Sequence, residues 1–424
     1  MPICPKCQGY VIKFPCPVCE QQSEESKSLS TEIHDATETS EEDKPSKTRA
    51  SEDHVSFPEP ANISFPRYDI NLHLEGKTVT AVDRTTDEVL KSYEAPKNLI
   101  VDNIEEVNYY NLKLHGLDKK AYEVHLRALE LEDSVSTEAG SIFSIQYESS
   151  LSLGAYYGTQ GWGLFQVTDN KIKIIFSRVM KEITTGFLTK FNEQLIFFLG
   201  FSDGSTKAIE LQWSPDKKDH IEKKDLWKVE VDSETTTVKL IDENLVSSHK
   251  DGYIRIRELN RGRLLKEVQI TDEGILCFEN NEKYWWIGTT NGYVFALNPL
   301  TWRLGWETKL SEYDIKGVNI FSNAVCFTDN EKSVYLLTLE PGKILRTIES
   351  KRGVTSKGVQ LKNWVIVAGA AAIVVFEENR YFETHTVGDK PIRALCSHPQ
   401  GIMIGNDNGE LFLWSYPSLK IIES

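Results

Sequence analysis

Short apolar runs alternate with turn residues from Arg67 to the end of the chain. One stretch shows the pattern clearly, with runs rich in apolar or aromatic residues at 275–278, 284–287, 294–297 and 304–307. Runs this short are typical of β-strands rather than helices. Gly, Asn and Asp separate them, and these residues favour tight turns. The pattern predicts four antiparallel strands within about 40 residues.

A glycine after Asp or Asn recurs between the apolar runs, at Asp203-Gly204, Asp251-Gly252, Asn291-Gly292 and Asn408-Gly409, with a weaker relative at Gln160-Gly161. From Gly161 to Gly292 these glycines lie 43, 48 and 40 residues apart, and the next 117 residues hold three steps of 39. Two further hairpins are therefore expected near Glu331-Lys332 and Ala371-Ala372, which makes seven units. Asn-Gly and Asp-Gly suit the positive φ of type I′ turns, so each is predicted to form a two-residue hairpin.

Four antiparallel strands repeating at about 40 residues are the signature of a β-propeller blade. The predicted fold class is all-β: a seven-bladed propeller over residues 137–424, with eight blades as the alternative. Residues 67–136 have hairpin-like stretches at 74–79 and 114–119 and are expected to form an accessory β segment or the extra blade. The last unit has four apolar runs of its own, so the pattern does not require an N-terminal strand to close the ring.

Two of the repeats resemble WD-type propeller blades. Residues 246–256 follow that family's strand, Asp-Gly, strand pattern, and residues 405–414 add its Trp at Trp414. The other repeats mostly lack this Trp, with Arg257 in its place in one of them, and none carries the family's Gly-His dipeptide. Residues 292–306 are similar instead to the pyrroloquinoline-quinone-type repeat. The resemblance implies a propeller fold and leaves the function open.

The composition is that of a globular chain, 40% hydrophobic and 26% charged, with a formal net charge of −15. This acidity argues against a nucleic-acid or anionic-membrane surface over the whole chain. The longest apolar stretch, Trp364 to Phe376, is too short to span a bilayer and is expected to form two buried strands. No secretory signal is visible. The chain is therefore expected to be cytoplasmic, without membrane insertion, and Cys277, Cys326 and Cys396 are expected to be buried free thiols.

Residues 21–66 are predicted to be a disordered acidic linker, rich in Ser, Thr and Glu. From Glu20 to Pro60 the chain has twelve acidic and four basic residues, so more than half of the net charge lies here. Low hydrophobicity and self-repulsion disfavour a packed core. A flexible spacer is the favoured interpretation, and a phosphorylatable or partner-docking segment is the alternative.

Four cysteines open the chain as Cys4-x2-Cys7 and Cys16-x2-Cys19. Two such pairs can hold one tetrahedral Zn²⁺, and four thiolates leave no open position for catalysis, so a structural zinc site is predicted. A redox-active dithiol or a disulfide pair is the alternative. Both pairs have the Cys-Pro-x-Cys form, and residues 1–20 resemble the short zinc-ribbon family. The metal would supply the folding free energy of so short a segment.

Several side chains of the repeats are candidates for catalysis or binding. His249 lies beside a turn and is expected to be exposed. The cluster Arg255, Arg257, Arg261, Arg263 and Lys266 is expected to be a solvated turn rather than an anion site, with a modest docking patch for an acidic partner as the alternative. Tyr156, Tyr157, Trp162 and residues 284–286 are expected to pack between blades. No HExxH pair, nucleophile elbow or P-loop occurs.

These patterns predict a non-enzymatic protein-interaction scaffold or adaptor, in which a zinc ribbon and a propeller bind different protein partners through a tether. The alternative is nucleic-acid binding through the ribbon, with Lys6, Tyr10, Lys13 and Phe14 as contacts. A third, weaker hypothesis is an enzyme whose polar residues meet in the central channel of the ring. Sequence order does not reveal such a convergence.

Overall fold

The computed structural model describes residues 61–423, except 66–67, 76–77, 95–100, 109–110, 117–120, 213–220, 341–342 and 378–379. The chain divides into two units, Met1–Ser56 and Phe57–Ser424, and the described residues all belong to the second. They form an all-β fold in which the helical segments are single 3-10 turns at Ser149–Leu151 and Thr290–Gly292. The predicted fold class, all-β, is confirmed.

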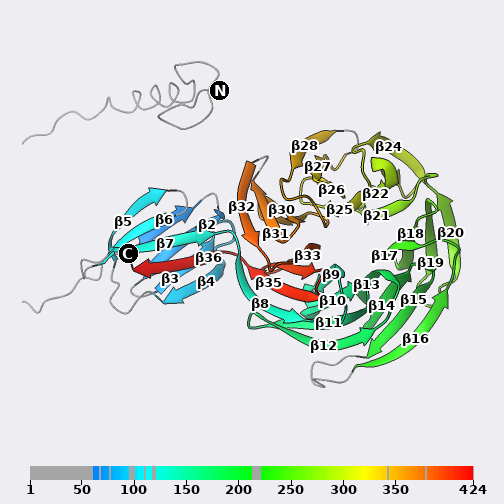
Figure 1. Ribbon diagram of the computed structural model, residues 1–424, viewed down its shortest axis with the longest axis horizontal. Coiled ribbons are helices and arrows are strands. Elements are labelled where there is room, and N and C mark those ends of the chain that lie inside the picture. Colours follow the sequence, from blue (N-terminus) through cyan, green and yellow to red (C-terminus); the bar gives the residue numbers. More distant parts are fainter. Residues whose placement is uncertain are drawn as a thin grey trace, which may run out of the picture. The chain divides into compact units, whose positions relative to one another are not determined.

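Four-stranded antiparallel sheets repeat around a ring, each with its first strand inside and its last outside (Figure 1). The first three of these sheets are β9 (Ile142–Glu148), β10 (Leu153–Gly158), β11 (Gly161–Thr168) and β12 (Lys171–Val179); β13 (Ile183–Phe191), β14 (Gln194–Phe201), β15 (Thr206–Gln212) and β16 (Glu222–Val229); and β17 (Thr235–Ile241), β18 (Asn244–His249), β19 (Tyr253–Glu258) and β20 (Leu264–Gln269).

The ring continues with β21 (Ile275–Asn280), β22 (Trp285–Thr289), β23 (Tyr293–Asn298) and β24 (Arg303–Lys309); β25 (Ile315–Ile320), β26 (Val325–Asp329), β27 (Ser333–Leu337) and β28 (Ile344–Glu349); β29 (Val359–Leu361), β30 (Trp364–Gly369), β31 (Ala372–Glu377) and β32 (Arg380–Thr386); and β33 (Ile392–His398), β34 (Gly401–Asn406) and β35 (Glu410–Ser415). The two hairpins without a glycine anchor occur where the repeat predicts them, between β26 and β27 and between β30 and β31.

The last sheet of the ring is completed from the N-terminal side of the chain. Strand β8 (Glu130–Ser136) pairs with β35 as its outer strand, from Ser415↔Glu130 to Glu410↔Ser136. The C-terminal strand β36 (Ser418–Glu423) instead leaves the ring and pairs with β7 (Ala121–Arg127). The ring was expected to begin at residue 137, but it also includes β8, because the fourth apolar run of the last unit, β36, belongs to the sheet of β7.

The N-terminal residues also form two further sheets (Figure 1). One contains β1 (Ala61–Phe65), β2 (Ile70–Glu75), β3 (Thr78–Asp83) and β4 (Val89–Glu94), and the other has the order β36, β7, β6 (Asn111–Gly116), β5 (Val101–Asn108). Strand β1 lies within the stretch 21–66 that was expected to be a linker. It is a strand because it pairs with β2 and buries Phe65, which is 5% exposed.

Outer strands share a β-bulge at an equivalent position in each of the ring sheets described above, and β4 has it too. An exposed apolar side chain pairs just before this bulge in six sheets: Val89, Leu131, Leu264, Leu304, Ile344 and Tyr381. Bulges raise the local twist of a strand. The exposed apolar residues thus mark a repeated feature of sheet geometry, and the sheet β1–β4 is built like a ring sheet.

Large side chains fill the space between neighbouring sheets, as the sequence predicts. Tyr157 stacks on Phe197 of the next sheet at 5.4 Å between ring centroids, and Trp286 meets Phe327 edge-on at 6.4 Å. Trp162 is fully buried. Strands that are covered on both faces have continuous apolar sequences. The apolar stretch Trp364 to Phe376 accordingly forms the buried strands β30 and β31. Both predictions are confirmed.

A further apolar cluster joins the sheet β1–β4 and strand β7 to the last two ring sheets. Tyr68 meets Trp364 and Phe382 at 5.9 and 5.5 Å between ring centroids, and Trp364 meets Tyr416 at 5.5 Å. The Tyr68 hydroxyl also donates to Glu383 at 3.2 Å, and Glu383 accepts from the Ala128 N–H at 3.1 Å. This packing makes the N-terminal sheets part of the same core.

The anchor glycines have a different role from the predicted one. Only Asn291-Gly292 has positive φ at both residues, +60° and +79°. At Gly204, Gly252 and Gly409 the glycine alone is left-handed, after a turn closed, for example, by the Gly252 N–H donating to the His249 carbonyl at 3.2 Å. Type I′-like pairs occur instead at the other end of the sheets, at Asp169-Asn170, Asn192-Glu193 and Asp242-Glu243.

Glycine is required at these turns because the next connection crosses them closely. The Ile270 N–H donates to the Gly252 carbonyl at 3.0 Å, and a Cβ on Gly252 would lie 1.9 Å from the Thr271 carbonyl oxygen. The equivalent Cβ on Gly292 would lie 1.8 Å from the Ser311 oxygen. The Asp-Gly and Asn-Gly signal therefore marks a backbone crossing between neighbouring sheets.

Gly252→Ala is expected to lower the free energy of unfolding by about 2 kcal/mol or more, because it adds a backbone clash to an unfavourable positive φ. Gly305→Ala is the matched control, since φ is not positive there and the nearest atoms lie 3.5 Å from the added Cβ. Urea unfolding of both variants measures the difference. Equal stability of the two variants would contradict the crossing as the reason for glycine.

Candidate interaction surface

One face of the ring carries the hairpins between the second and third strands together with the connections from each outer strand to the next inner strand. Hydrogen bonds between the two sets place them at the same end of the sheets, such as Leu310 N–H to the Gly292 carbonyl at 2.9 Å. We call this end the connection face. Loops held by rigid sheets are common sites of binding.

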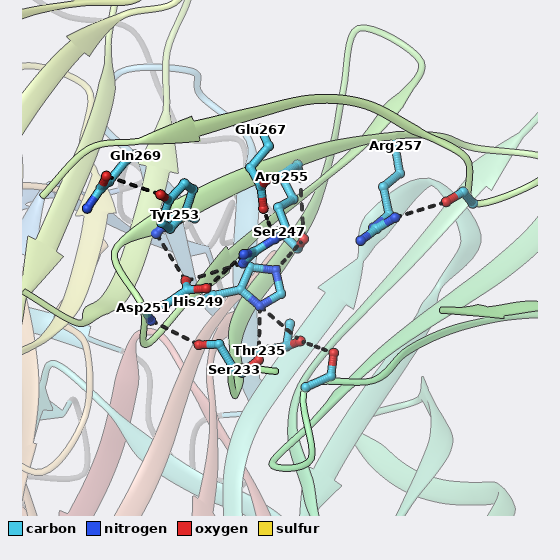
Figure 2. A network of polar contacts seen from close by, with 12 residues as sticks. Ser233, Thr235, Ser247, His249, Asp251, Tyr253, Arg255, Arg257, Glu267 and Gln269 are labelled. Atoms are coloured by element: carbon cyan, nitrogen blue, oxygen red, sulfur yellow. Dashed lines mark hydrogen bonds and ion pairs between the residues drawn. The ribbon is translucent and has the colours of Figure 1, made fainter. Parts of the chain in front are cut away.

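Buried polar side chains hold one hairpin of this face, in the sheet β17–β20 (Figure 2). The His249 Nδ1 lies 3.3 Å from the Ser233 carbonyl and 3.5 Å from the Thr235 hydroxyl, and its Nε2 lies 2.9 Å from the Ser247 hydroxyl. Because a carbonyl only accepts, these partners assign the proton to Nδ1 and make Nε2 the acceptor from Ser247. The expectation that His249 is exposed is wrong: the side chain is 1% exposed, since its strand extends to the turn.

Arg255 lies beside this histidine and forms the centre of the ionic part of the network (Figure 2). Its guanidinium donates to both carboxylate oxygens of Asp251, at 3.2 and 2.7 Å, and its Nε lies 2.6 Å from Glu267. The Tyr253 ring lies 5.2 Å from the guanidinium carbon. Burial raises the pKa of Asp251, but the hydrogen bonds from Arg255 and the Tyr253 N–H outweigh it, so the pKa is lowered overall. The Asp251 turn is thus clamped to two strands.

The other arginines of this cluster separate into buried and exposed members. Arg257 is 6% exposed and donates to the Gly262 carbonyl at 3.2 Å, and burial lowers its pKa. Arg261, Arg263 and Lys266 are exposed. The prediction that these side chains are solvated is therefore wrong for Arg255 and Arg257, which are buried against neighbouring strands and turns. It is confirmed for the other three.

Carboxylates concentrate on one part of the connection face. Eight lie in the hairpins and connections that follow β16, β18, β20 and β24, and we call them the acidic arc: Glu230, Asp232, Glu234, Asp251, Asp272, Glu273, Glu312 and Asp314. The connection after β28, residues 350–358, has no acidic residue and contains Lys351, Arg352 and Lys357. The basic connection thus follows the acidic arc along the same face, and Glu331 of the hairpin between β26 and β27 lies beside it, since the Val354 N–H donates to the Glu331 carbonyl at 3.0 Å.

Polar side chains also line the central channel, where inner strands contact one another. Gln146 exchanges two hydrogen bonds with the Leu188 backbone, at 2.8 and 2.7 Å, and the Asn319 amide donates to the Gly358 carbonyl at 3.1 Å. Lys239 forms an ion pair with Glu279 of the next sheet. Burial lowers the pKa of Lys239. These partners are satisfied across sheet boundaries, so the channel side chains link neighbouring sheets and none of the pairs joins a nucleophile to a base.

The three cysteines of the ring are free thiols, as expected, but only two are fully buried. Cys277 and Cys326 are 8% and 0% exposed, whereas Cys396 is half-buried. Burial raises the pKa of Cys277 to about 12 and raises that of Cys326 and Cys396. Since the thiolate is the reactive form, burial disfavours reaction of these thiols at neutral pH.

The predicted zinc ligands Cys4, Cys7, Cys16 and Cys19 lie outside the described residues, as do Lys6, Tyr10, Lys13 and Phe14. Within the part of the chain that the structure describes, no group of three or more His, Cys, Asp or Glu side chains is arranged to hold a metal ion. The same part contains no helix long and apolar enough to cross a membrane.

Comparison with known proteins identifies the fold. No family model matches the chain, and no curated protein matches it. Among solved structures, the chain is similar to the WD40 β-propeller domain of Doa1, with 12% sequence identity and a TM-score of 0.56 over 68% of this chain and 97% of that one. The fold is WD40 β-propeller-like. An identity this low shows the fold alone.

Two features of the sequence indicate parts of this site: the strand that ends at His249 and the basic stretch 350–358. Residues 247–249, Ser-Ser-His, directly follow the apolar residues Leu245 and Val246, so extending this buried strand to the turn predicts that His249 is buried. The basic stretch 350–358 was visible in the sequence as a gap in the repeat, because no apolar run of ordinary length follows it until Trp364.

Acid is expected to destabilise the fold through its buried histidines. Burial lowers the pKa of His249 and of His398 to about 4, against about 6.5 in the unfolded chain. The unfolded state therefore binds more protons between these values, and the free energy of unfolding falls by up to about 3 kcal/mol for each histidine as pH drops from 6.5 to 4.

Urea unfolding at several pH values measures this loss in the wild type and in His249→Gln. The variant is expected to start less stable at pH 7 but to lose about 3 kcal/mol less on acidification. His398→Gln serves as the matched comparison at a second site. Parallel pH profiles of wild type and both variants would contradict the assignment to these residues.

Proposed function

We propose that the protein is a non-enzymatic protein-interaction scaffold, in which a seven-bladed propeller presents its connection face to protein partners. The observation that carries this proposal is the distribution of charge on that face: the eight carboxylates of the acidic arc lie in the hairpins and connections that follow β16 to β24, and the basic connection 350–358 follows β28. Separated charges orient a partner and raise the rate of its association.

Rigidity of the hairpins supports the same proposal. The clamp of Arg255 on Asp251 and the glycine crossings fix the loops before a partner arrives. Pre-ordered loops lose less conformational entropy on binding. The thiols with raised pKa and the satisfied channel pairs offer no reactive group among the described residues.

Affinity capture with the full chain, followed by purification of the captured partner, tests the scaffold proposal. The loop variant combines Asp272→Lys with Glu312→Lys on the acidic arc, and the matched control combines Glu282→Lys with Glu340→Lys at the other end of the sheets, where both residues are exposed. We expect the purified partner to bind the loop variant at least about tenfold more weakly and to bind the control like the wild type.

Equal binding to wild type and loop variant would contradict use of this part of the face. Turnover of a small substrate by the isolated full chain would contradict the non-enzymatic assignment. Circular dichroism and thermal unfolding of each variant confirm that lost binding is not lost folding.

The proposal extends to the N-terminus, where Cys4, Cys7, Cys16 and Cys19 would hold one structural Zn²⁺ as a ribbon that binds a second protein partner. Support for it comes from the spacing of the two Cys-Pro-x-Cys pairs. No observation on the described residues favours the nucleic-acid alternative.

Elemental analysis of the full chain is expected to give one zinc per molecule, and Cys7→Ser combined with Cys16→Ser is expected to give none. Cys277→Ser combined with Cys326→Ser is the matched control and should keep the zinc. A full chain without zinc and with disulfide-bonded N-terminal cysteines would favour the redox alternative instead.

A further inference from the structure

The connection after β28 differs from the other connections of the ring. It runs over nine residues, 350–358, whereas the others between outer and inner strands have three to five. The strand that follows, β29, has three residues and is the shortest inner strand of the ring. The connection therefore takes the place of the first half of an inner strand, the strand position nearest the centre of the ring.

Hydrogen bonds to neighbouring strands and turns fix the backbone of this connection. The Thr355 N–H and hydroxyl both donate to the Ala368 carbonyl, at 2.9 and 3.2 Å, and the Val354 N–H donates to the Glu331 carbonyl at 3.0 Å. Val354 is 2% exposed and packs in an apolar cluster. Its cationic residues lie on both sides of this buried anchor, so the loop presents them from an ordered support.

A fourth cation, Lys316, lies one residue before a point where β25 touches the backbone of this connection. It precedes Gly317, and a Cβ on Gly317 would lie 2.6 Å from the Cα of Lys357, so the two backbones touch. Lys316, Lys351 and Arg352 are exposed, and Lys357 is half-buried. We call Lys316, Lys351, Arg352 and Lys357 the basic cluster.

The basic cluster is uncompensated, unlike other cations of the connection face. Lys250 pairs with Glu234 at 2.7 Å, Lys309 with Glu312 at 2.6 Å, and Arg393 with Asp407 at 2.9 Å. Within the described ranges, none of the four side chains of the basic cluster forms an ion pair. In a chain with a net charge of −15, these cations therefore have no ion-pair partner in the part that the structure describes, although Glu331 lies beside the connection through its backbone.

We propose that the basic cluster binds a short acidic segment of a partner protein, an inference that rests on the scaffold function proposed above. Carboxylates of such a segment would pair with the exposed cations of the basic cluster. A long polyanion would also meet the acidic arc on the same face, which repels it, so the surface favours a short acidic peptide over nucleic acid.

Fluorescence anisotropy with a labelled peptide of ten glutamates tests the proposal on the full chain. The test variant combines Lys351→Glu with Arg352→Glu. The matched control combines Arg261→Glu with Arg303→Glu, which makes the same charge change at exposed positions on the other end of the sheets. We expect the test variant to bind at least about tenfold more weakly, the control to bind like the wild type, and binding to weaken as salt rises.

A conservative variant separates charge from shape: Lys351→Arg with Arg352→Lys is expected to keep the affinity. Equal weakening by the test and control variants would overturn the proposal, since net charge rather than the cluster would explain it. Absence of measurable wild-type binding would overturn it too.

Tighter binding of a ten-nucleotide oligo-dT than of the glutamate peptide, lost in the test variant, would overturn the choice of partner class. A captured partner that depends on the acidic arc, together with no peptide binding, would leave the scaffold function standing and remove only this inference. Thermal unfolding of every variant shows that the ring is intact.

Discussion

The structure depends on one long pairing, in which β7 and β8 run antiparallel to β36 and β35. Its register is continuous across the boundary between the ring and the N-terminal sheets: Arg127 pairs with Ser418, and Glu130 pairs with Ser415. The chain segment of β7 and β8 and the segment of β35 and β36 therefore each contribute one strand to a ring sheet and one strand to an N-terminal sheet. Because a one-residue slip would turn buried side chains outward in two sheets at once, this register is strongly fixed.

Charged side chains reinforce this ribbon where it passes between the sheets. Lys91 of β4 lies 2.7 Å from Glu132 and 3.4 Å from Glu130, and the Ser418 hydroxyl donates to Glu130 at 3.3 Å. On the other side, Lys362 pairs with the buried carboxylate of Asp83, whose pKa is lowered to about 2 although burial opposes the shift. Partly buried pairs of this kind are costly to break on one side only. The N-terminal sheets are thus fixed to the ring by pairing, apolar packing and ion pairs together.

The rigid ring fixes the loops of the connection face. Side chains of the inner strands bond to the backbone or side chains of neighbouring sheets, and the hairpins lie directly under the next connection at glycine, so the loops of the connection face have little freedom of their own. Cations in the sheets of the acidic arc pair with neighbouring carboxylates, as Lys250 does with Glu234 and Lys309 with Glu312, whereas the connection 350–358 has no carboxylate of its own. The net charge of the chain says nothing about this arrangement.

The sequence by itself determined the strands, the repeat and the burial of the aromatic residues, because these follow from local alternation and from residues at fixed spacing. Ile275, Trp286 and Val294 lie on strands that apolar runs predict directly. Tertiary structure decided which strand closes the ring, since the outer position beside β35 could be filled from either end and the choice depends on pairing across some 280 residues. It also decided that His249 is buried, that Asp-Gly marks a backbone crossing, and that Gly317 meets the backbone of Lys357. These depend on what a neighbouring sheet places against a residue, and no local pattern contains that information.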